Sequence, residues 1–325
     1  MKRENIIGRA NVEDTPELEA YYEALEGEAL GALWNVANKI EPWFPQPKSV
    51  PTHWKWRTVE PYVRKAAELV SAEKAARRVV MLVNPGRKEW SAAAGLLYTG
   101  VQVMNAGEST SAHRHQASAL RFVMEGRGAY TVVDGERMTL GARDFVLTPN
   151  GTWHDHGVEE GGTQCVWQDG LDIPLMNSLD ANFYEVHPEV VQKPSGLSRE
   201  NWQKPYSPVF LYKWDDAYKA VRKHGVHEYT NPLTGGPVMP TMGARLELIK
   251  ETKPIRHTGS LIYQVASGRG WSEVGGKRFE WEEKDIFCVP SWQLYRHGAH
   301  GEAVLFCFND LPAMRALSLY REAHQ

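Results

Sequence analysis

The stretch Glu125-Gly126-Arg127-Gly128 returns in the second half of the chain as Ser267-Gly268-Arg269-Gly270. Matching residues continue on the carboxyl-terminal side of both copies, and the second copy is one residue shorter in its first turn. The later matches are Gly135 with Gly276, Asp144-Phe145 with Asp285-Ile286, Pro149 with Pro290, and Gly157 with Gly298. Each copy consists of short β-rich runs punctuated by glycine turns. This duplication predicts two β-barrels or jelly rolls, which close or pack their strands so that few edges are exposed.

The segments outside the two copies have residue patterns typical of helices and linkers. Thr15 before Pro16 is typical of a helix start, and apolar residues recur at helical spacing beyond it. A short apolar strand is expected at 78–83. Five prolines in the stretch before the second copy indicate a linker. The sequence therefore predicts a mostly β chain with a helical segment over 1–90, a first barrel over 91–170, a linker over 171–208, a second barrel over 209–312 and a short helix over 313–325.

The composition is that of an ordinary globular protein. The 325 residues are 42% hydrophobic and 24% charged, which suits two domains. A formal net charge of −3 lacks the basic excess of nucleic-acid-binding proteins. The chain shows neither a signal-peptide pattern nor an apolar run long enough for a bilayer, so we expect a cytoplasmic protein without nucleic-acid or membrane partners. Of the three cysteines, Cys288 and Cys307 lie in apolar runs, where buried free thiols are expected.

Histidines in the first copy predict a metal site. His113 and His115 are two residues apart, so their side chains point to the same face of a strand. His154 follows in the element Pro149-x-Gly151-x-x-His154 and supplies a third imidazole. Three histidines on one face of an octahedral ion leave positions open for substrate and oxygen, as in the facial-triad Fe(II) oxygenases. Structural or surface histidines are the alternative, and the spaced glycine and proline favour the metal.

The second copy has lost this pattern. The residues aligned with the three histidines are, in chain order, Ile255, His257 and Tyr295. Because one imidazole of the three remains, we expect no tightly bound metal in this copy. Its expected role is structural, in completing the core and building a subunit interface.

The sequence around the histidines resembles the gentisate 1,2-dioxygenase family. The resemblance rests on residues 111–122 (SAHRHQASALRF), 153–157 (WHDHG) and 167–175 (WQDGLDIPL), and it extends over most of the chain. It implies a bicupin fold of two double-stranded β-helix barrels, an Fe(II) cofactor and a homotetramer. It also implies cleavage by O2 of the C1–C2 bond of gentisate, a salicylate or 1-hydroxy-2-naphthoate.

Four further residues are candidates for handling the substrate. Arg121 lies at an even spacing from the second histidine, on the ligand face of its strand, where a cation can pair a substrate carboxylate. A solvent-exposed salt bridge is the alternative for this residue. His156 shares the face of the third histidine and suits a proton donor or hydrogen-bond partner, or else a structural role. The resemblance aligns Gln102 and Asp169 with polar positions of the family's pocket, although residues that bond at strand ends would also fit.

Two departures from the related proteins bear on the substrate. Many cupins carry a glutamate ligand four or five residues after the second histidine, where this chain has Ala119 and Leu120. Three neutral ligands leave Fe(II) more cationic, which favours an anionic chelating substrate such as a salicylate. Gentisate-type relatives usually carry an arginine just before the Leu-Tyr-x-Gly strand, but residues 89–96 (EWSAAAGL) contain none. We therefore expect a less polar pocket wall that accepts gentisate and 5-substituted salicylates, such as chloro- and nitrosalicylate, almost equally.

The sequence thus predicts a ring-cleaving dioxygenase whose Fe(II) is held by His113, His115 and His154. Another cupin metalloenzyme, an isomerase or a decarboxylase, would need neither iron nor oxygen and is the second hypothesis. A non-catalytic cupin that binds a small molecule is the third. Sensors of that kind usually add a basic DNA-binding module, and the amino-terminal helical segment forms no obvious helix-turn-helix.

Overall fold

A computed structural model of the chain describes residues 15–75, 77–190, 192 and 206–324. It divides into two units, Met1–Gln46 and Pro47–Gln325. The described part of the first unit contains two helices, α1 (Pro16–Gly27) and α2 (Leu33–Ile40). The hydroxyl of Thr15 accepts a hydrogen bond from the backbone N–H of Leu18 at 3.2 Å, which confirms the predicted helix start. Among the described residues, no helix is long and apolar enough to cross a membrane.

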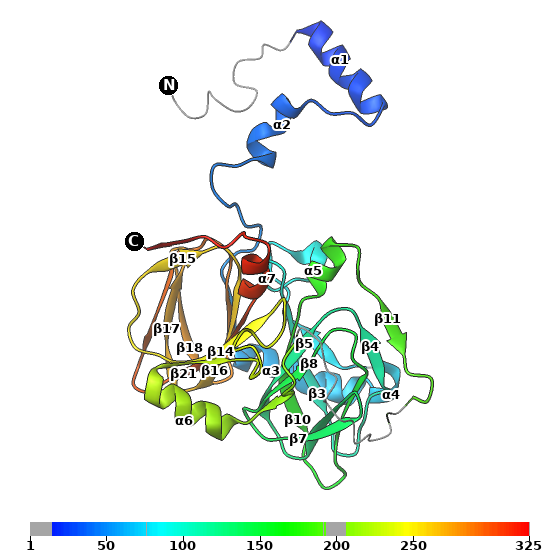
Figure 1. Ribbon diagram of the computed structural model, residues 1–325, viewed down its shortest axis with the longest axis vertical. Helices are drawn as coiled ribbons and strands as arrows, with labels where there is room; N and C mark the ends of the chain where they lie inside the picture. Colours follow the sequence, from blue (N-terminus) through cyan, green and yellow to red (C-terminus); the bar gives the residue numbers. More distant parts are fainter. Residues whose placement is uncertain (1–14, 76, 191, 193–205, 325) are drawn as a thin grey trace. The chain divides into compact units, whose positions relative to one another are not determined.

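The first barrel of the second unit is built from two sheets (Figure 1). One sheet has the strand order β12-β8-β5-β10-β3-β2, and the other has the order β11-β4-β9-β6-β7. The bounds are β2 (Val79–Met81), β3 (Tyr98–Met104), β4 (His113–His115), β5 (Ala119–Glu125), β6 (Ala129–Val133), β7 (Glu136–Leu140), β8 (Phe145–Thr148), β9 (His154–Val158), β10 (Cys165–Leu171), β11 (Tyr184–Val186) and β12 (Leu211–Tyr212).

The second barrel repeats this arrangement strand for strand. Its sheets have the orders β1-β19-β16-β21-β14-β13 and β18-β17-β20-β15-β22. The bounds are β1 (Thr52–Trp54), β13 (Val226–Tyr229), β14 (Gly243–Leu248), β15 (Ile255–His257), β16 (Leu261–Ser267), β17 (Arg269–Val274), β18 (Lys277–Glu282), β19 (Ile286–Val289), β20 (Tyr295–Ala299), β21 (Val304–Asn309) and β22 (Glu322–His324). The mostly β, two-barrel fold predicted from the duplication is confirmed.

Glycines of the repeated stretch explain why it recurs. Gly126 and Gly268 end the equivalent strands β5 and β16, with φ angles of +106° and +84°. A Cβ atom on Gly126 would lie 2.6 Å from the Cα atom of Cys165, and one on Gly268 would lie 2.7 Å from the Cα atom of Ala303. Both positions combine a left-handed backbone with close approach of the neighbouring strand, so only glycine fits.

Strands β1 and β12 lie outside the sequence range predicted for their barrel. Strand β1 precedes the first barrel in the chain, yet it pairs antiparallel with β19 of the second barrel. Strand β12 follows the first barrel's other strands and pairs with its β8. Between the barrels, the rings of Phe122 and Phe306 stack with centroids 4.1 Å apart. The two six-stranded sheets therefore share one hydrophobic core.

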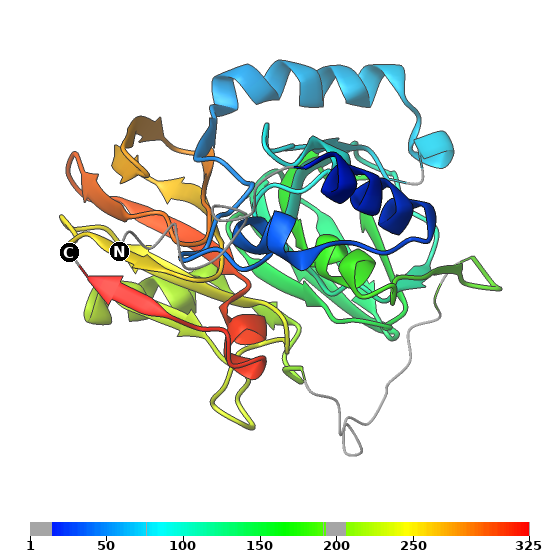
Figure 2. The ribbon, with the colours of Figure 1, turned by 90° about the horizontal axis from the view of Figure 1, so that it is seen from above.

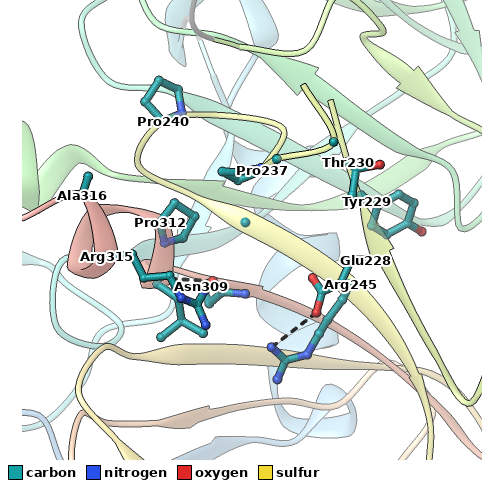
Figure 3. Close-up of a pocket in the computed structure, with 14 residues that line it drawn as sticks. Glu228, Tyr229, Thr230, Pro237, Pro240, Arg245, Asn309, Pro312, Arg315 and Ala316 are labelled. Carbon is teal, nitrogen blue, oxygen red and sulfur yellow. Dashed lines mark hydrogen bonds and ion pairs between the residues drawn. The ribbon is translucent and has the colours of Figure 1, made fainter. Parts of the chain in front are cut away.

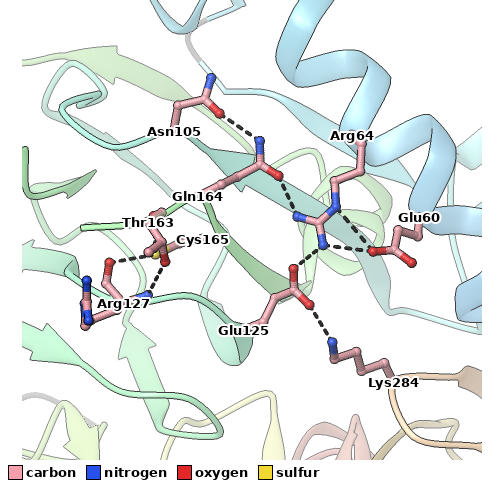
Figure 4. Close-up of polar contacts among 9 residues, drawn as sticks. All are labelled: Glu60, Arg64, Asn105, Glu125, Arg127, Thr163, Gln164, Cys165 and Lys284. Carbon is pink, nitrogen blue, oxygen red and sulfur yellow. Dashed lines mark hydrogen bonds and ion pairs between the residues drawn. The ribbon is translucent and has the colours of Figure 1, made fainter. Parts of the chain in front are cut away.

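Helix α3 (Trp56–Leu69) lies along the outside of the first barrel, against β2 and β3 (Figure 2). Arg64 on this helix donates to the side chain of Gln164 at 2.5 Å and forms an ion pair with Glu125 at the end of β5. Glu125 also pairs with Lys284 of the second barrel (Figure 4). The carboxylate of Glu125 thus links α3 and the second barrel to the first barrel.

The remaining connections differ in part from the prediction. The strand expected at 78–83 is β2, and the helical pattern before it is split into α3 and α4 (Ala72–Ala75). The segment predicted as a linker over 171–208 contains α5 (Ile173–Ser178) and strand β11, and part of it lies outside the described residues. The helix predicted over 313–325 is α7 (Leu311–Ala316), and the chain then forms strand β22. The last short elements are a 3₁₀ helix (Lys88–Trp90) and α6 (Trp214–His224).

Candidate metal centre and active site

Three histidines of the first barrel meet at one point. His113 and His115 project from the same face of β4, and His154 begins β9, directly opposite His113 in the antiparallel pair. One ring nitrogen from each lies within 4.8 Å of the others, and all three side chains are buried. The alternation of β4 and the β4–β9 register therefore bring together the residues that the sequence predicted as metal ligands.

The hydrogen bonds of these three rings fix their orientation. The Nδ1 atoms lie 2.8, 2.7 and 2.9 Å from the backbone carbonyl oxygens of Ser111, Ala117 and Thr152, in chain order of the histidines. A carbonyl oxygen can only accept, so each Nδ1 carries the hydrogen and each Nε2 keeps its lone pair. The buried Nε2 atoms of all three have no partner among the described residues. Such outer hydrogen bonds are the usual support of metal-binding imidazoles.

Burial keeps these imidazoles neutral. It lowers the pKa of His113 to about 4 and that of His115 to about 3, with a further contribution from the positive charge of Arg77. It also holds the pKa of His154 well below its ordinary value. Since a metal ion binds the unprotonated nitrogen, all three ligands are ready to bind at neutral pH. The group fits a metal ion.

His156 lies beside the three ligands but is held differently. Its ring centroid is 5.5 Å from that of His154, and the side chain is fully buried. The Nδ1 atom lies 2.9 Å from the hydroxyl oxygen of Thr131, and the Nε2 atom has no partner among the described residues. Burial and then the charge of Arg121 hold the pKa of His156 well below its ordinary value. His156 is therefore a neutral ring with one nitrogen facing the site.

A cavity of about 650 Å³ opens next to these histidines. Tyr184 connects the two, because it lines the cavity and its ring stacks on His113 with centroids 5.3 Å apart. The polar lining residues are Arg77, Tyr98, Gln102, Arg121, Asp169 and Tyr184, and the apolar ones are Ala75, Val79, Met81, Leu171 and Ile173. The cavity thus contains all of the predicted substrate residues except His156, which lies among the histidines.

Arg121 and Asp169 form a buried ion pair in the wall of this cavity. They are directly opposite each other on β5 and β10, and the Nε to Oδ1 distance is 3.1 Å. Arg121 also donates to the hydroxyl of Thr148 at 2.6 Å. Both groups are almost fully buried, so the alternative of a solvent-exposed salt bridge is wrong for Arg121. Burial raises the pKa of Asp169 to about 6 and lowers that of Arg121 to about 10, against the attraction between them.

This pair predicts a pH-dependent loss of stability. Replacing Arg121 by alanine leaves the Asp169 carboxylate buried without its cation, and we expect the free energy of unfolding to fall by roughly 3 kcal/mol at pH 8. The pKa of Asp169 is above its unfolded value and rises further in the variant. The deficit should therefore shrink toward pH 5, where the carboxyl is protonated. Urea unfolding at both pH values measures it, and the double variant R121A/D169N should lose this pH dependence. An equal deficit at both pH values would contradict the pairing.

Gln102 offers further polar atoms to the cavity. It lies on β3, is 1% exposed, and neither its amide nitrogen nor its amide oxygen has a partner among the described residues. A buried polar group without a partner costs free energy unless a ligand or water satisfies it. The position suits contact with a substrate.

Sequence reasoning missed Arg77 and Tyr98, and it placed the pocket wall wrongly. Residues 89–96 do not line the cavity. Ala93 is fully buried, and its carbonyl accepts a hydrogen bond from the side chain of Asn84 at 3.0 Å. Of the two arginines that line the cavity, Arg121 is paired with Asp169, and Arg77, on the bend before β2, forms no ion pair with a carboxylate among the described residues. Its guanidinium lies 5.7 Å from the ring centroid of Tyr184.

A second cavity, of about 660 Å³, lies at the other barrel (Figure 3). Its described lining contains no histidine. Arg245 at this cavity is already engaged, because its Nε atom donates to Glu247 at 2.7 Å and its Nη1 atom lies 3.9 Å from Glu228. The arrangement offers no metal-binding group, and we assign it no role in catalysis.

In the second barrel, side chains occupy the position that corresponds to the metal centre. Ile255 and Tyr295 pair across β15 and β20 as His113 and His154 do across β4 and β9. The hydroxyl of Tyr295 lies 3.1 Å from the Nε2 atom of His257. In the described part of this barrel, no group of three potential metal ligands converges. The correspondence inferred between the two copies is confirmed at these positions.

Two jelly-roll barrels, with a metal-binding group of three histidines in the first, define a metal-dependent protein of the bicupin class. The cupin domain family model matches residues 100–174. Gentisate 1,2-dioxygenase 1 of Aquipseudomonas alcaligenes is 36% identical, over 95% of this chain and 97% of its own length. The 5-aminosalicylate 1,2-dioxygenase of a Comamonas species is 34% identical, over 94% and 90%. Salicylate 1,2-dioxygenase from Pseudoaminobacter salicylatoxidans, solved as an adduct with gentisate, superposes with a TM-score of 0.91 at 31% identity, covering 100% of this chain and 98% of that one.

The chain belongs to the gentisate 1,2-dioxygenase family of ring-cleaving dioxygenases. This membership confirms the predicted class of enzyme. It favours ring cleavage over both alternatives, the isomerase or decarboxylase and the non-catalytic binding protein.

Proposed function

We propose that the metal is Fe(II) and that the protein uses O2 to open the bond between C1 and C2 of a 2-hydroxybenzoate. The favoured substrates are gentisate and 5-substituted salicylates. The relatives are named for gentisate, 5-aminosalicylate, salicylate and 1-hydroxy-2-naphthoate, which share a carboxylate next to a ring hydroxyl. A ligand set of three neutral imidazoles, with apolar Ala119 and Leu120 buried where other cupins carry a glutamate, suits an anionic chelating substrate.

One observation carries this proposal most directly: three unpartnered Nε2 atoms converge beside a cavity that presents an arginine. His113, His115 and His154 would hold the iron, which when bound would supply the oxygen-activating chemistry that side chains lack. Arg77 would bind the substrate carboxylate, and Gln102 would donate to or accept from a ring substituent. Apolar neighbours such as Val79 and Leu171 would contact the ring and exclude water from it.

The apolar part of the lining also bears on selectivity. Five of the eleven lining residues have apolar side chains, and Arg121 and Asp169 are paired with each other, which leaves apolar wall against which a 5-substituent other than hydroxyl can lie. We therefore rank gentisate and 5-substituted salicylates almost level.

Oxygen uptake by the Fe(II)-loaded protein tests the proposal. We expect O2 consumption and ring opening with gentisate, salicylate, 5-chlorosalicylate and 5-nitrosalicylate. The values of kcat/KM for gentisate and the 5-substituted salicylates should differ by much less than a thousandfold, a ratio that corresponds to about 4 kcal/mol in transition-state free energy. A larger preference for gentisate would contradict the relaxed selectivity. Turnover without O2 would contradict the reaction itself.

Arg77 predicts a separate effect on substrate binding. Replacing it by alanine should raise KM by about tenfold to a hundredfold, the effect of losing a charge-assisted interaction worth about 1.5–3 kcal/mol, while metal content stays normal. Arg315→Ala is the matched control, because Arg315 is an exposed arginine at the other cavity. Equal KM values for Arg77→Ala, Arg315→Ala and the parent would exclude the assignment.

A further inference from the structure

The four histidines of the first barrel are of two kinds, distinguished by what their Nδ1 atoms face. In the three metal ligands this nitrogen faces a backbone carbonyl, which forces the hydrogen onto Nδ1. In His156 it faces the hydroxyl of Thr131, 2.9 Å away. A hydroxyl can donate or accept, so the fourth ring is not held in the ligand form.

The position of the available hydrogen-bond acceptors distinguishes the two possible forms of His156. If Nδ1 carried the hydrogen and donated it to Thr131, the hydroxyl hydrogen of Thr131 would be left in a buried place with no other acceptor among the described residues. If Thr131 donates to Nδ1, that hydrogen is used and the ring hydrogen moves to Nε2, which faces the site without a protein partner. Either arrangement leaves one hydrogen without a protein acceptor, but only the second places that hydrogen on Nε2, where an oxygen of a bound ligand can accept it, whereas the hydroxyl hydrogen of Thr131 has no acceptor within reach among the described residues.

We propose that Thr131 is a positioning residue that holds His156 in the form with the hydrogen on Nε2, so that this ring donates a hydrogen bond into the site instead of binding the metal. This inference deepens the proposed function. It rests on that function for the identity of the group that accepts the hydrogen bond from Nε2, which is a metal-side oxygen of the substrate. The form of the ring itself follows from the contacts of Thr131 and His156.

The second barrel supports this reading independently, because it keeps the same frame without the metal. His297 occupies the position of His156, and its Nδ1 atom lies 2.7 Å from the hydroxyl oxygen of Ser272. That oxygen accepts a hydrogen bond from the indole N–H of Trp281 at 2.9 Å, so its own hydrogen is free to point at His297. The backbone N–H of His297 donates to Thr252 at 2.7 Å, as that of His156 donates to a threonine hydroxyl in the first barrel.

The corresponding bond in the first barrel runs to Thr110 at 3.0 Å. Both barrels therefore hold this histidine by one hydroxyl on its ring and one on its backbone. Because Ser272 already accepts from Trp281, its own hydrogen is available to donate to the Nδ1 atom of His297. We assign the same direction to Thr131.

Two variants at one position test the proposal by kinetics. Thr131→Val keeps the shape of the side chain and removes the hydroxyl, and we expect kcat to fall roughly tenfold, within the range of one lost hydrogen bond, with KM and metal content little changed. Thr131→Ser should restore kcat, since the second barrel uses serine there. Ser272→Ala, the matched change in the metal-free barrel, should leave kcat at the parent value.

Imidazole ¹⁵N NMR tests the ring form without any turnover. The probe is histidine-labelled protein loaded with diamagnetic Zn(II), and the His156→Gln variant identifies the resonances of His156. We expect a protonated Nε2 and an unprotonated Nδ1 in the parent and in Thr131→Ser, and loss of this fixed pattern in Thr131→Val. A protonated Nδ1 in the parent, or an unchanged pattern and kcat in Thr131→Val, would overturn the proposal. If no hydroxybenzoate is turned over while the NMR pattern is as expected, the proposed function fails and the assignment of Thr131 stands.

Discussion

Replacing His154 by alanine is expected to remove the metal ion and the ring-cleaving activity together. His154 is fully buried and supplies one of three convergent nitrogens, so its loss leaves two ligands and an empty space at the base of the site. The same outcome is expected for His113→Ala and His115→Ala. Metal content per chain, measured by elemental analysis beside oxygen uptake, checks the prediction. The parent should hold one iron per chain, with Fe–N distances of roughly 2.0–2.2 Å by analogy with other first-row metals.

The second barrel provides the control for this experiment. His257 corresponds to His115, but its Nε2 atom is occupied by the hydroxyl of Tyr295. His257→Ala should therefore leave metal content and activity at the parent level. If all three ligand variants kept a full complement of iron, or if metal were found at His257 or His297, the assignment of the centre would be wrong.

His156→Ala should separate chemistry from metal binding. The ring faces the site through Nε2 without supporting a ligand, so iron content should stay near normal. Turnover should fall by roughly 10²–10⁴-fold, the usual contribution of a group that donates or accepts a proton in the transition state. Steady-state kinetics with metal analysis on the same preparation measures both quantities.

His297→Ala is the matched control, because it removes an equally buried ring from an equivalent frame with no metal beside it. It should reduce stability and leave kcat per folded enzyme unchanged. A His156→Ala enzyme with the parent's kcat and KM would show that the ring has only a structural role.

The fold could be predicted because the repeated glycines mark positions where the backbone tolerates no side chain, and these positions recur in both copies. Gly126 and Gly268 sit where a side chain would collide with the adjacent strand. The edge strands β11 and β22 escaped prediction because each is only three residues long, too short to establish a period, and their side chains are mostly exposed. They are equivalent members of the two barrels, so the duplication extends into the segment that proline content had marked as a linker.

The site was predictable where one strand sets the geometry and not where two strands meet. The spacing of His113 and His115 determines a shared face, which is a property of a single strand. The pairing of Arg121 with Asp169 depends on the register between β5 and β10, and the cavity position of Arg77 depends on β2 joining β3. No local pattern reports those pairings, so the ion pair between Arg121 and Asp169 could not be predicted, and the substrate role of Arg121 stays a prediction.

The pairing of β1 with β19 and the core shared by the two six-stranded sheets tie the two halves together in inheritance as well as in space. A gene fragment starting at residue 209 would lack β1 and leave β19 with a bare edge, whereas a fragment ending after residue 212 would still contain β12. A descendant that discarded the metal-free half would leave the apolar face of the catalytic half's six-stranded sheet, including Phe122, exposed to water. This is a physical reason for a chain to retain a barrel whose histidines have been replaced.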